Sequence, residues 1–308
     1  MRGKSIVSVP EAGLTVQEAL TKFLRDCQIR NLRPATIETY ENFIKSYVEF
    51  IGAETDVSHV TKDSIEEWIL YEQKKEIKDV TVVSKVRNVR AWVYFLMRES
   101  IIPEFKINLP KCDDVYKEPY TDEELARLLA TPTSHAFVEW RTWALIAFLI
   151  GTGCRISTAL VVRICDLNFS EGYVKFTHLK NRHIQLTPIS SELKKILMTY
   201  LSLWQYTEED YLFNNSYETG PIAKSTAQQE IKRYNNSRGI KKTSAHLFRH
   251  TFSKNYILAG GGVFQLQRIL GHADISTTRH YVQLYNADLL VNYDNLCPLD
   301  VLLNKRKE

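Results

Sequence analysis

The sequence predicts a mainly α-helical protein with two domains, of which the second combines helices with a small antiparallel sheet. Apolar residues recur at helical spacing along most of the 308 residues. A segment at 103–118 interrupts this periodicity with prolines and charges, as a linker between domains does. In the second half, two short runs of period two flank a polar turn, which indicates the sheet.

An all-helical domain is expected at residues 14–102, after a flexible arm at 1–13. Thr15 and Glu18 have the spacing of a capping box, in which each side chain bonds the other residue's backbone N–H and so opens a helix. Apolar residues at helical spacing mark three further helices. They cover residues 35–51, 65–71 and about 80–98.

The last of these helices is basic beside its apolar stripe. Lys85, Arg87 and Arg90 flank the valines that are expected to face the core. A solvated charged face explains such a pattern when the helix is considered alone. Scattered tryptophans such as Trp68, Trp140 and Trp204 are interpreted as core residues.

A second domain is expected at residues 119–285, where a capping box at Thr121 opens it. The two strands of a β-hairpin are expected at 173–176 and 183–186, and Pro188 would end the hairpin. Four helical regions complete the domain. They lie at residues 140–150, 191–204, 226–234 and from about 244 onward.

Composition and charge limit the classes of function. Hydrophobic residues make up 44% and charged residues 25%, as in an ordinary folded protein, and the net charge of +4 only weakly suggests nucleic acid. The five cysteines have long spacings and no CxxC pair, which argues against disulfides and zinc and fits a reducing compartment. Because no segment is apolar enough for a signal peptide or a membrane span, we expect a cytoplasmic protein without a membrane partner.

Two arginines of the second domain lie in patterns that suit a phosphate. His246 and Arg249 are three residues apart on a predicted helix, so an imidazole and a guanidinium share one face. Arg155 follows a glycine-containing turn, although the glycines lack the GK[ST] ending of a phosphate loop. Taken singly, each pattern is equally well explained by a helix cap or a surface side chain.

Two further motifs lie nearer the end of the sequence. His272 follows Leu270 and Gly271, and Tyr281 comes nine residues later. A tyrosine hydroxyl has an ordinary pKa of about 10, so it attacks well only where cations surround it and the target is an anionic phosphodiester. A buried structural tyrosine is the ordinary explanation for Tyr281 when it is considered alone.

Together, these motifs resemble those of the tyrosine recombinases, the family of phage-integrase-like and Xer-like enzymes. That family has an arginine in a TGxR turn, a lysine in a β-hairpin, an HxxR, a GH and a tyrosine. The residues that match are Arg155, Lys180, His246, Arg249, His272 and Tyr281. The stretches 32–40 and 86–96 resemble the family's N-terminal core-binding domain, so the resemblance covers nearly the whole chain.

The resemblance implies chemistry that needs no metal and no cofactor. Tyr281 would attack a phosphodiester of duplex DNA while the two arginines hold its oxygens and His272 donates a hydrogen bond. His246 would accept the tyrosine proton or position the phosphate, and Lys180 would protonate the departing 5′ oxygen. The product would be a 3′-phosphotyrosine, which a 5′-hydroxyl of a partner duplex can resolve.

The resemblance also implies a C-shaped clamp of two domains on double-stranded DNA and a homotetramer that synapses two sites. The tail at 286–308 would dock in a neighbouring protomer, and a helix packed on its own domain is the alternative. On a DNA-binding protein, several basic residues become candidate contacts. They are Lys85, Arg87, Arg90, Lys241 and Lys242.

Two positions depart from the family pattern or leave it open. Thr158 stands where the family commonly has an acidic residue, and Lys175 and Arg182 lie close enough to Lys180 to compete for its role. Integration or excision of a mobile element is the expected role, with Xer-like resolution of plasmid or chromosome dimers as the alternative. A type IB topoisomerase and a non-catalytic DNA-binding relative are the other two possibilities.

Overall fold

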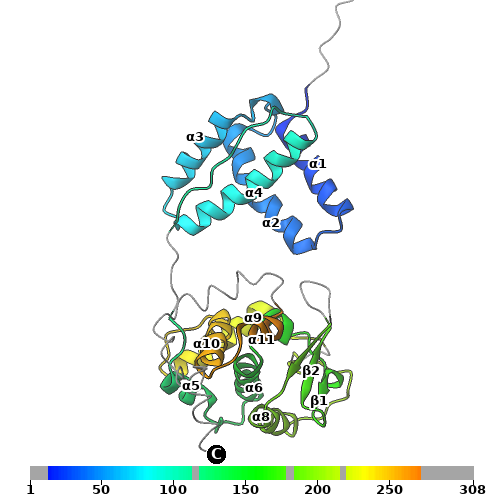
Figure 1. The fold of residues 1–308 in the computed structure, drawn as a ribbon, viewed down its shortest axis with the longest axis vertical. Coiled ribbons are helices and arrows are strands. Elements are labelled where there is room, and N and C mark those ends of the chain that lie inside the picture. Colours follow the sequence, from blue (N-terminus) through cyan, green and yellow to red (C-terminus); the bar gives the residue numbers. More distant parts are fainter. Residues whose placement is uncertain (1–12, 113–117, 178–183, 216–219, 272–308) are drawn as a thin grey trace, which may run out of the picture. The chain divides into compact units, whose positions relative to one another are not determined.

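A computed structural model of the chain describes residues 13–112, 118–177, 184–215 and 220–271. The chain divides into two compact units, Met1–Tyr116 and Lys117–Glu308, and each has its own hydrophobic core. The described residues are mainly helical, with one small antiparallel sheet in the second unit (Figure 1). This confirms the predicted fold class.

Unit 1 contains four α-helices among its described residues. They are α1 (Val16–Ile29), α2 (Pro34–Ile51), α3 (Lys62–Gln73) and α4 (Asp79–Arg98), with a 3-10 turn η1 (Val57–His59) before α3. The capping box of Thr15 and Glu18 is present, with bonds of 2.9 and 3.1 Å. Helix α3 is longer than predicted because a second capping box, at Thr61, opens it earlier.

Aromatic rings fill the core of unit 1. Trp68 and Trp92 are fully buried, as predicted for Trp68, and the Tyr47 ring lies 5.5 and 5.9 Å from them. Part of the segment predicted as linker packs on this core, since Ile107 is buried in it and Phe105 and Leu109 pack against it. Their burial follows from the apolar side chains that alternate with the prolines and charges of that segment.

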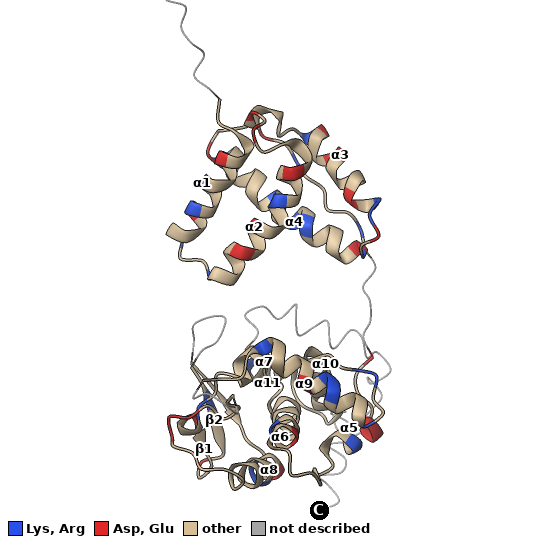
Figure 2. Ribbon diagram, turned by 180° about the vertical axis from the view of Figure 1, so that it is seen from behind, with Lys and Arg blue, Asp and Glu red and all other residues tan. Residues whose placement is uncertain are grey.

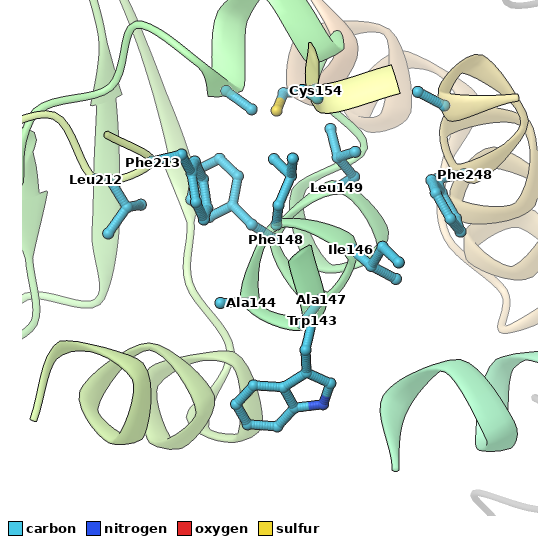
Figure 3. Close-up of a cluster of buried hydrophobic side chains, with 14 of the residues drawn as sticks. Trp143, Ala144, Ile146, Ala147, Phe148, Leu149, Cys154, Leu212, Phe213 and Phe248 are labelled. Atoms are coloured by element: carbon cyan, nitrogen blue, oxygen red, sulfur yellow. The ribbon is translucent and has the colours of Figure 1, made fainter. Parts of the chain in front are cut away.

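Unit 2 is organised around one central helix. The helices among its described residues are α5 (Asp122–Leu129), α6 (Phe137–Thr152), α7 (Ile156–Ala159), α8 (Ser191–Leu201), α9 (Lys224–Ser237), α10 (Ala245–Leu258) and α11 (Val263–Leu270), with a 3-10 turn η2 (Ile164–Asp166). Helix α6 is apolar on nearly all sides and contacts α5, α8, α9 and α10 (Figure 1). Phe148 and Leu149 of α6 lie in the cluster that also contains Phe213 and Phe248 (Figure 3).

All four helical regions of unit 2 differ from their predicted extent. Helices α6 and α9 are longer at both ends than the predicted 140–150 and 226–234, and the helix predicted at 191–204 ends at Leu201. The region predicted from 244 onward contains two helices in its described part, which ends at 271, because glycines at 260–262 separate α10 from α11. The second of these helices ends at Gly271, whose left-handed backbone (φ 64°) stops it immediately before His272 in the sequence.

The sheet has three antiparallel strands in the order β1 (Leu167–Asn168), β2 (Tyr173–Phe176), β3 (Gln185–Pro188). Strand β2 confirms the prediction. The second hairpin strand begins two residues later than predicted. Pro188 ends this strand, as predicted, and pairs with Tyr173. Proline is tolerated there because β3 is an edge strand, where a missing N–H need not be replaced. Strand β1 was not predicted, since two residues show no alternation.

Candidate active site

The turn that carries Arg155 is fixed by the end of α6. Gly153 caps that helix in the left-handed conformation (φ 63°), and its N–H donates to the carbonyl of Leu149 at 3.0 Å. A Cβ at Gly153 would lie 2.3 Å from the Phe252 ring of α10, so only glycine fits. Arg155 then caps α7 with extended backbone, and its side chain is partly exposed. Among the described residues, the side chain of Arg155 forms no hydrogen bond or ion pair.

Helix α10 contributes Arg249, whose side chain is 2% exposed. Its Nη1 donates to the carbonyl of Gly153 at 2.9 Å, and its Nη2 donates to the carbonyl of Leu270 at 2.9 Å. One guanidinium therefore joins the turn before Arg155 to the end of α11. His246, one turn earlier on α10, is exposed, and its ring lies perpendicular to that of His250 with 4.7 Å between centroids.

The sequence analysis did not single out Gln185, which also reaches the end of α11. This first residue of β3 donates from Nε2 to the carbonyl of Ile269 at 2.5 Å. The bond spans 84 positions of sequence, and no local pattern could have indicated it. Two side chains from different elements, Gln185 and Arg249, thus bond successive carbonyls of α11.

Three of the six predicted catalytic residues lie outside the described residues: Lys180, His272 and Tyr281. The predicted tail at 286–308 lies outside them as well. Lys175, which competes for the role of Lys180, is exposed on β2. The structure therefore brings together the Arg155 turn, Arg249 and the end of the helix that precedes His272.

Two side chains beside Arg155, those of Cys154 and Thr158, are buried. Thr158 is 6% exposed, and its N–H donates to the carbonyl of Arg155 at 2.8 Å. An ionised acid at this buried position would need a charged or hydrogen-bonding partner to offset its desolvation, whereas the neutral hydroxyl of threonine costs less to bury. Burial raises the pKa of the Cys154 thiol to about 11, so this thiol stays neutral at pH 7 and does not compete as a nucleophile.

The start of unit 2 is fastened to the same helix α10. The Tyr120 ring stacks on Phe248, with 4.6 Å between centroids and 13° between planes. Its N–H donates to Thr251 Oγ1 at 3.0 Å, and its hydroxyl donates to the carbonyl of Lys242 at 3.1 Å. Phe248 lies between His246 and Arg249 in the sequence of α10. The stacking of Tyr120 on Phe248 therefore supports the helix that carries these two candidate residues.

The candidate DNA contacts of unit 1 differ in how free their charges are. Basic and acidic residues are interspersed on α3 and α4 (Figure 2). Lys85 Nζ lies 2.6 Å from Glu72 Oε2, and the Arg90 guanidinium lies 5.9 Å from the centre of the Tyr94 ring. Arg87 is exposed.

In unit 2 the two neighbouring lysines also differ. Lys241 is exposed, whereas Lys242 donates to Glu124 Oε2 and to the carbonyl of Pro119, both at 2.9 Å. Among the residues that the structure describes, no three or more acidic, histidine or cysteine side chains gather as metal ligands, and no helix is both long and apolar enough to cross a membrane.

Comparison with known proteins gives the family to which this chain belongs. The sequence model of the phage integrase family matches residues 120–288, more than half of the 308 residues. The chain therefore belongs to this family, the tyrosine recombinases, which catalyse DNA strand cleavage and rejoining. The resemblance predicted from the motifs is confirmed.

Curated relatives span most of the chain. A tyrosine recombinase of Pseudothermotoga lettingae is 27% identical over 267 residues, which are 84% of this chain and 91% of the relative. The tyrosine recombinase XerD of Halalkalibacterium halodurans is 24% identical and covers 88% of this chain and 94% of its own.

Solved structures show the same fold. The Tn1549 transposon integrase in complex with a circular intermediate DNA has a TM-score of 0.74 at 21% identity, over 87% of this chain and 95% of that one. The XerH site-specific recombinase bound to its difH substrate has a TM-score of 0.69 at 19% identity, over 89% and 82%.

Proposed function

We propose that the chain recombines double-stranded DNA at specific sites through a covalent link to Tyr281. The observation that carries this proposal is the position of Arg249, which bonds both the turn that leads to Arg155 and the helix end that leads to His272. A guanidinium has five N–H donors in a planar fork, a geometry that matches the oxygens of a phosphate. The known DNA complexes of the Tn1549 integrase and XerH support a DNA partner.

The proposed reaction is a transfer of the phosphoryl group. The Tyr281 oxygen forms a bond to phosphorus, the bond from phosphorus to the 5′ oxygen breaks, and Lys180 gives that oxygen a proton. Arg155, Arg249 and His272 stabilise the charge of the pentavalent transition state. His246 accepts the tyrosine proton or holds the phosphate. The 5′-hydroxyl of a second duplex reverses the sequence, so the bond energy is conserved in the link.

A nicked suicide substrate tests this assignment. Loss of the short strand beyond the nick prevents religation, so the wild-type chain should accumulate a covalent adduct with DNA that is visible on a denaturing gel. Tyr281→Phe should form none, while the matched variant Tyr285→Phe, four residues away, should form it at the wild-type rate. An adduct with Tyr281→Phe would show that another residue is the nucleophile.

We propose integration or excision of a mobile element as the biological role, carried out by a homotetramer on two synapsed sites. The coverage of the XerD relatives favours a second candidate, the resolution of plasmid or chromosome dimers. Sequencing of the DNA trapped on Tyr281 in cells separates the two. Adducts at both ends of one element support integration, whereas adducts at a single chromosomal or plasmid site support resolution.

A further inference from the structure

We propose that Gln185 is a positioning residue that fixes the β2–β3 hairpin so that its lysine can protonate the leaving oxygen. This inference rests on the proposed function, because it assigns a role to a contact beside that site. The side chain joins the first residue of β3 to the last turn of α11. In sequence, Lys180 lies five residues before Gln185.

The Gln185 amide is held from several directions. Its Nε2 donates to the carbonyl of Ile269 at 2.5 Å and to Thr187 Oγ1 at 3.1 Å. The last carbonyls of a helix have no partner within that helix, so a side chain that bonds one of them replaces water there. Gly271 leaves room for the amide, since a Cβ on it would lie 2.4 Å from Gln185 Oε1.

The other contacts of β3 hold this part of the strand weakly. Ile184 and Leu186, on either side of Gln185, are 65% and 57% exposed, so their side chains contribute little packing. Strand β3 also lies at the edge of the sheet, where it pairs only with β2 among the described strands. Gln185 is therefore the side chain that ties the beginning of β3 to the body of unit 2.

At the α11 end of the Gln185 contact, a second side chain also holds the helix. Helix α11 is also held by Arg249, which donates to the carbonyl of Leu270 at 2.9 Å. Loss of the Gln185 amide would thus leave α11 in place and remove a side-chain hydrogen bond that joins the beginning of β3 to α11, while β3 stays paired with β2. This asymmetry locates the expected defect in the proton donor of the hairpin rather than in the groups that hold the phosphate.

Two substrates distinguish this role from a purely structural one. In the first, the nicked suicide substrate has an ordinary 5′ oxygen at the scissile phosphate. In the second, sulfur replaces that oxygen, and a thiolate is a good leaving group without a proton. A residue that acts through the proton donor matters for the first substrate and not for the second.

Gln185→Met keeps the length of the side chain and removes both donors. We expect it to cleave the oxygen substrate about 10- to 100-fold more slowly than wild type, the loss typical of a misplaced catalytic group. It should cleave the sulfur substrate within about threefold of wild type and bind DNA equally well. Leu186→Ala, the exposed neighbour on β3, is the matched control and should cleave both substrates normally.

Several outcomes would overturn the proposal. Equal cleavage of the oxygen substrate by Gln185→Met and wild type would show that the contact has no catalytic consequence. An equal defect with both substrates would assign Gln185 to phosphate binding or to folding. If Gln185→Met folds poorly, Gln185→Glu repeats the test, because it also lacks the Nε2 donor. A wild-type chain that traps no adduct would instead refute the proposed function, so the two failures are distinguishable.

Discussion

Each unit buries a charged side chain, and the two units satisfy it differently. In unit 1, the Glu72 carboxylate is 0% exposed and accepts bonds of 2.6 Å from Lys75 and Lys85. In unit 2, the Arg249 guanidinium is 2% exposed and donates to the carbonyls of Gly153 and Leu270. Both arrangements meet the requirement that a buried charge be hydrogen-bonded.

The two arrangements differ in the partners that the charged group bonds. Lys75 and Lys85 form ion pairs with Glu72, so the ammonium group of Lys85 is already occupied within unit 1. The bonds from Arg249 to two main-chain carbonyls orient its guanidinium at the turn before Arg155 and the end of α11. A charge that is held away from bulk water interacts strongly with a phosphate. We therefore expect the ion pairs of Glu72 to serve stability and propose that Arg249 serves the chemistry.

Arg249→Lys should have the largest effect on the reaction among the substitutions that test this difference between the units. Lysine keeps the charge but has no planar fork, so it cannot bond two carbonyls and a phosphate together. We expect adduct formation on the nicked substrate to fall by about 100-fold or more, the cost of losing one donor to a developing oxyanion. Gel quantification of the adduct over time gives the rate, and anisotropy with labelled DNA should show nearly unchanged binding.

Arg141→Lys is the matched control for that experiment. Arg141 is also buried in unit 2, at 3% exposure, where it donates to Glu230 and to the carbonyl of Asn214, both at 2.7 Å. Its replacement should lower the free energy of unfolding and leave the adduct rate of the folded protein within about threefold. Equal rates for Arg249→Lys and Arg141→Lys would remove the catalytic role of Arg249.

Glu72→Gln tests whether the ion pairs of Glu72 stabilise unit 1. The amide leaves the cations of Lys75 and Lys85 without their counter-charge. Because both lysine side chains are partly exposed, we expect a loss of about 1–3 kcal/mol in the free energy of opening of unit 1. Hydrogen exchange of peptides from α3 and α4 measures this loss, and peptides from α6 in unit 2 serve as the internal reference.

We also expect the stabilising contribution of Glu72 to depend on pH. Burial acts to raise the pKa of the Glu72 carboxyl, but the bonds from Lys75 and Lys85 outweigh it and hold this pKa below its ordinary value of 4.5. A depressed folded-state pKa stabilises the protein above the unfolded-state value, and the contribution is lost as the pH falls through the folded-state value. The advantage of wild type over Glu72→Gln should therefore shrink below pH 4.5. An advantage that grows there would contradict the ion-pair assignment.

Local patterns and distant contacts were not equally predictable from the sequence. The capping box at Thr15, the buried Trp68 and strand β2 depend on residues close in sequence, and all were predicted. One partner of Arg249 and one of Gln185 lie 96 and 84 positions away, so only the folded chain reveals these contacts. A periodic pattern shows which face of a helix is polar, but it does not show which cation on that face meets a carboxylate from another helix.

Lys85 and Arg87 give the finest test of this distinction. Both flank the apolar stripe of α4, but Lys85 Nζ lies 2.6 Å from Glu72 whereas Arg87 is exposed. Each phosphate contact contributes close to one unit to the slope of log affinity against log salt concentration. Arg87→Met should reduce that slope by about one, measured by anisotropy over a salt series, while Lys85→Met should change it by less than about half a unit. An equal loss of slope in both variants would mean that Lys85 leaves Glu72 to bind DNA.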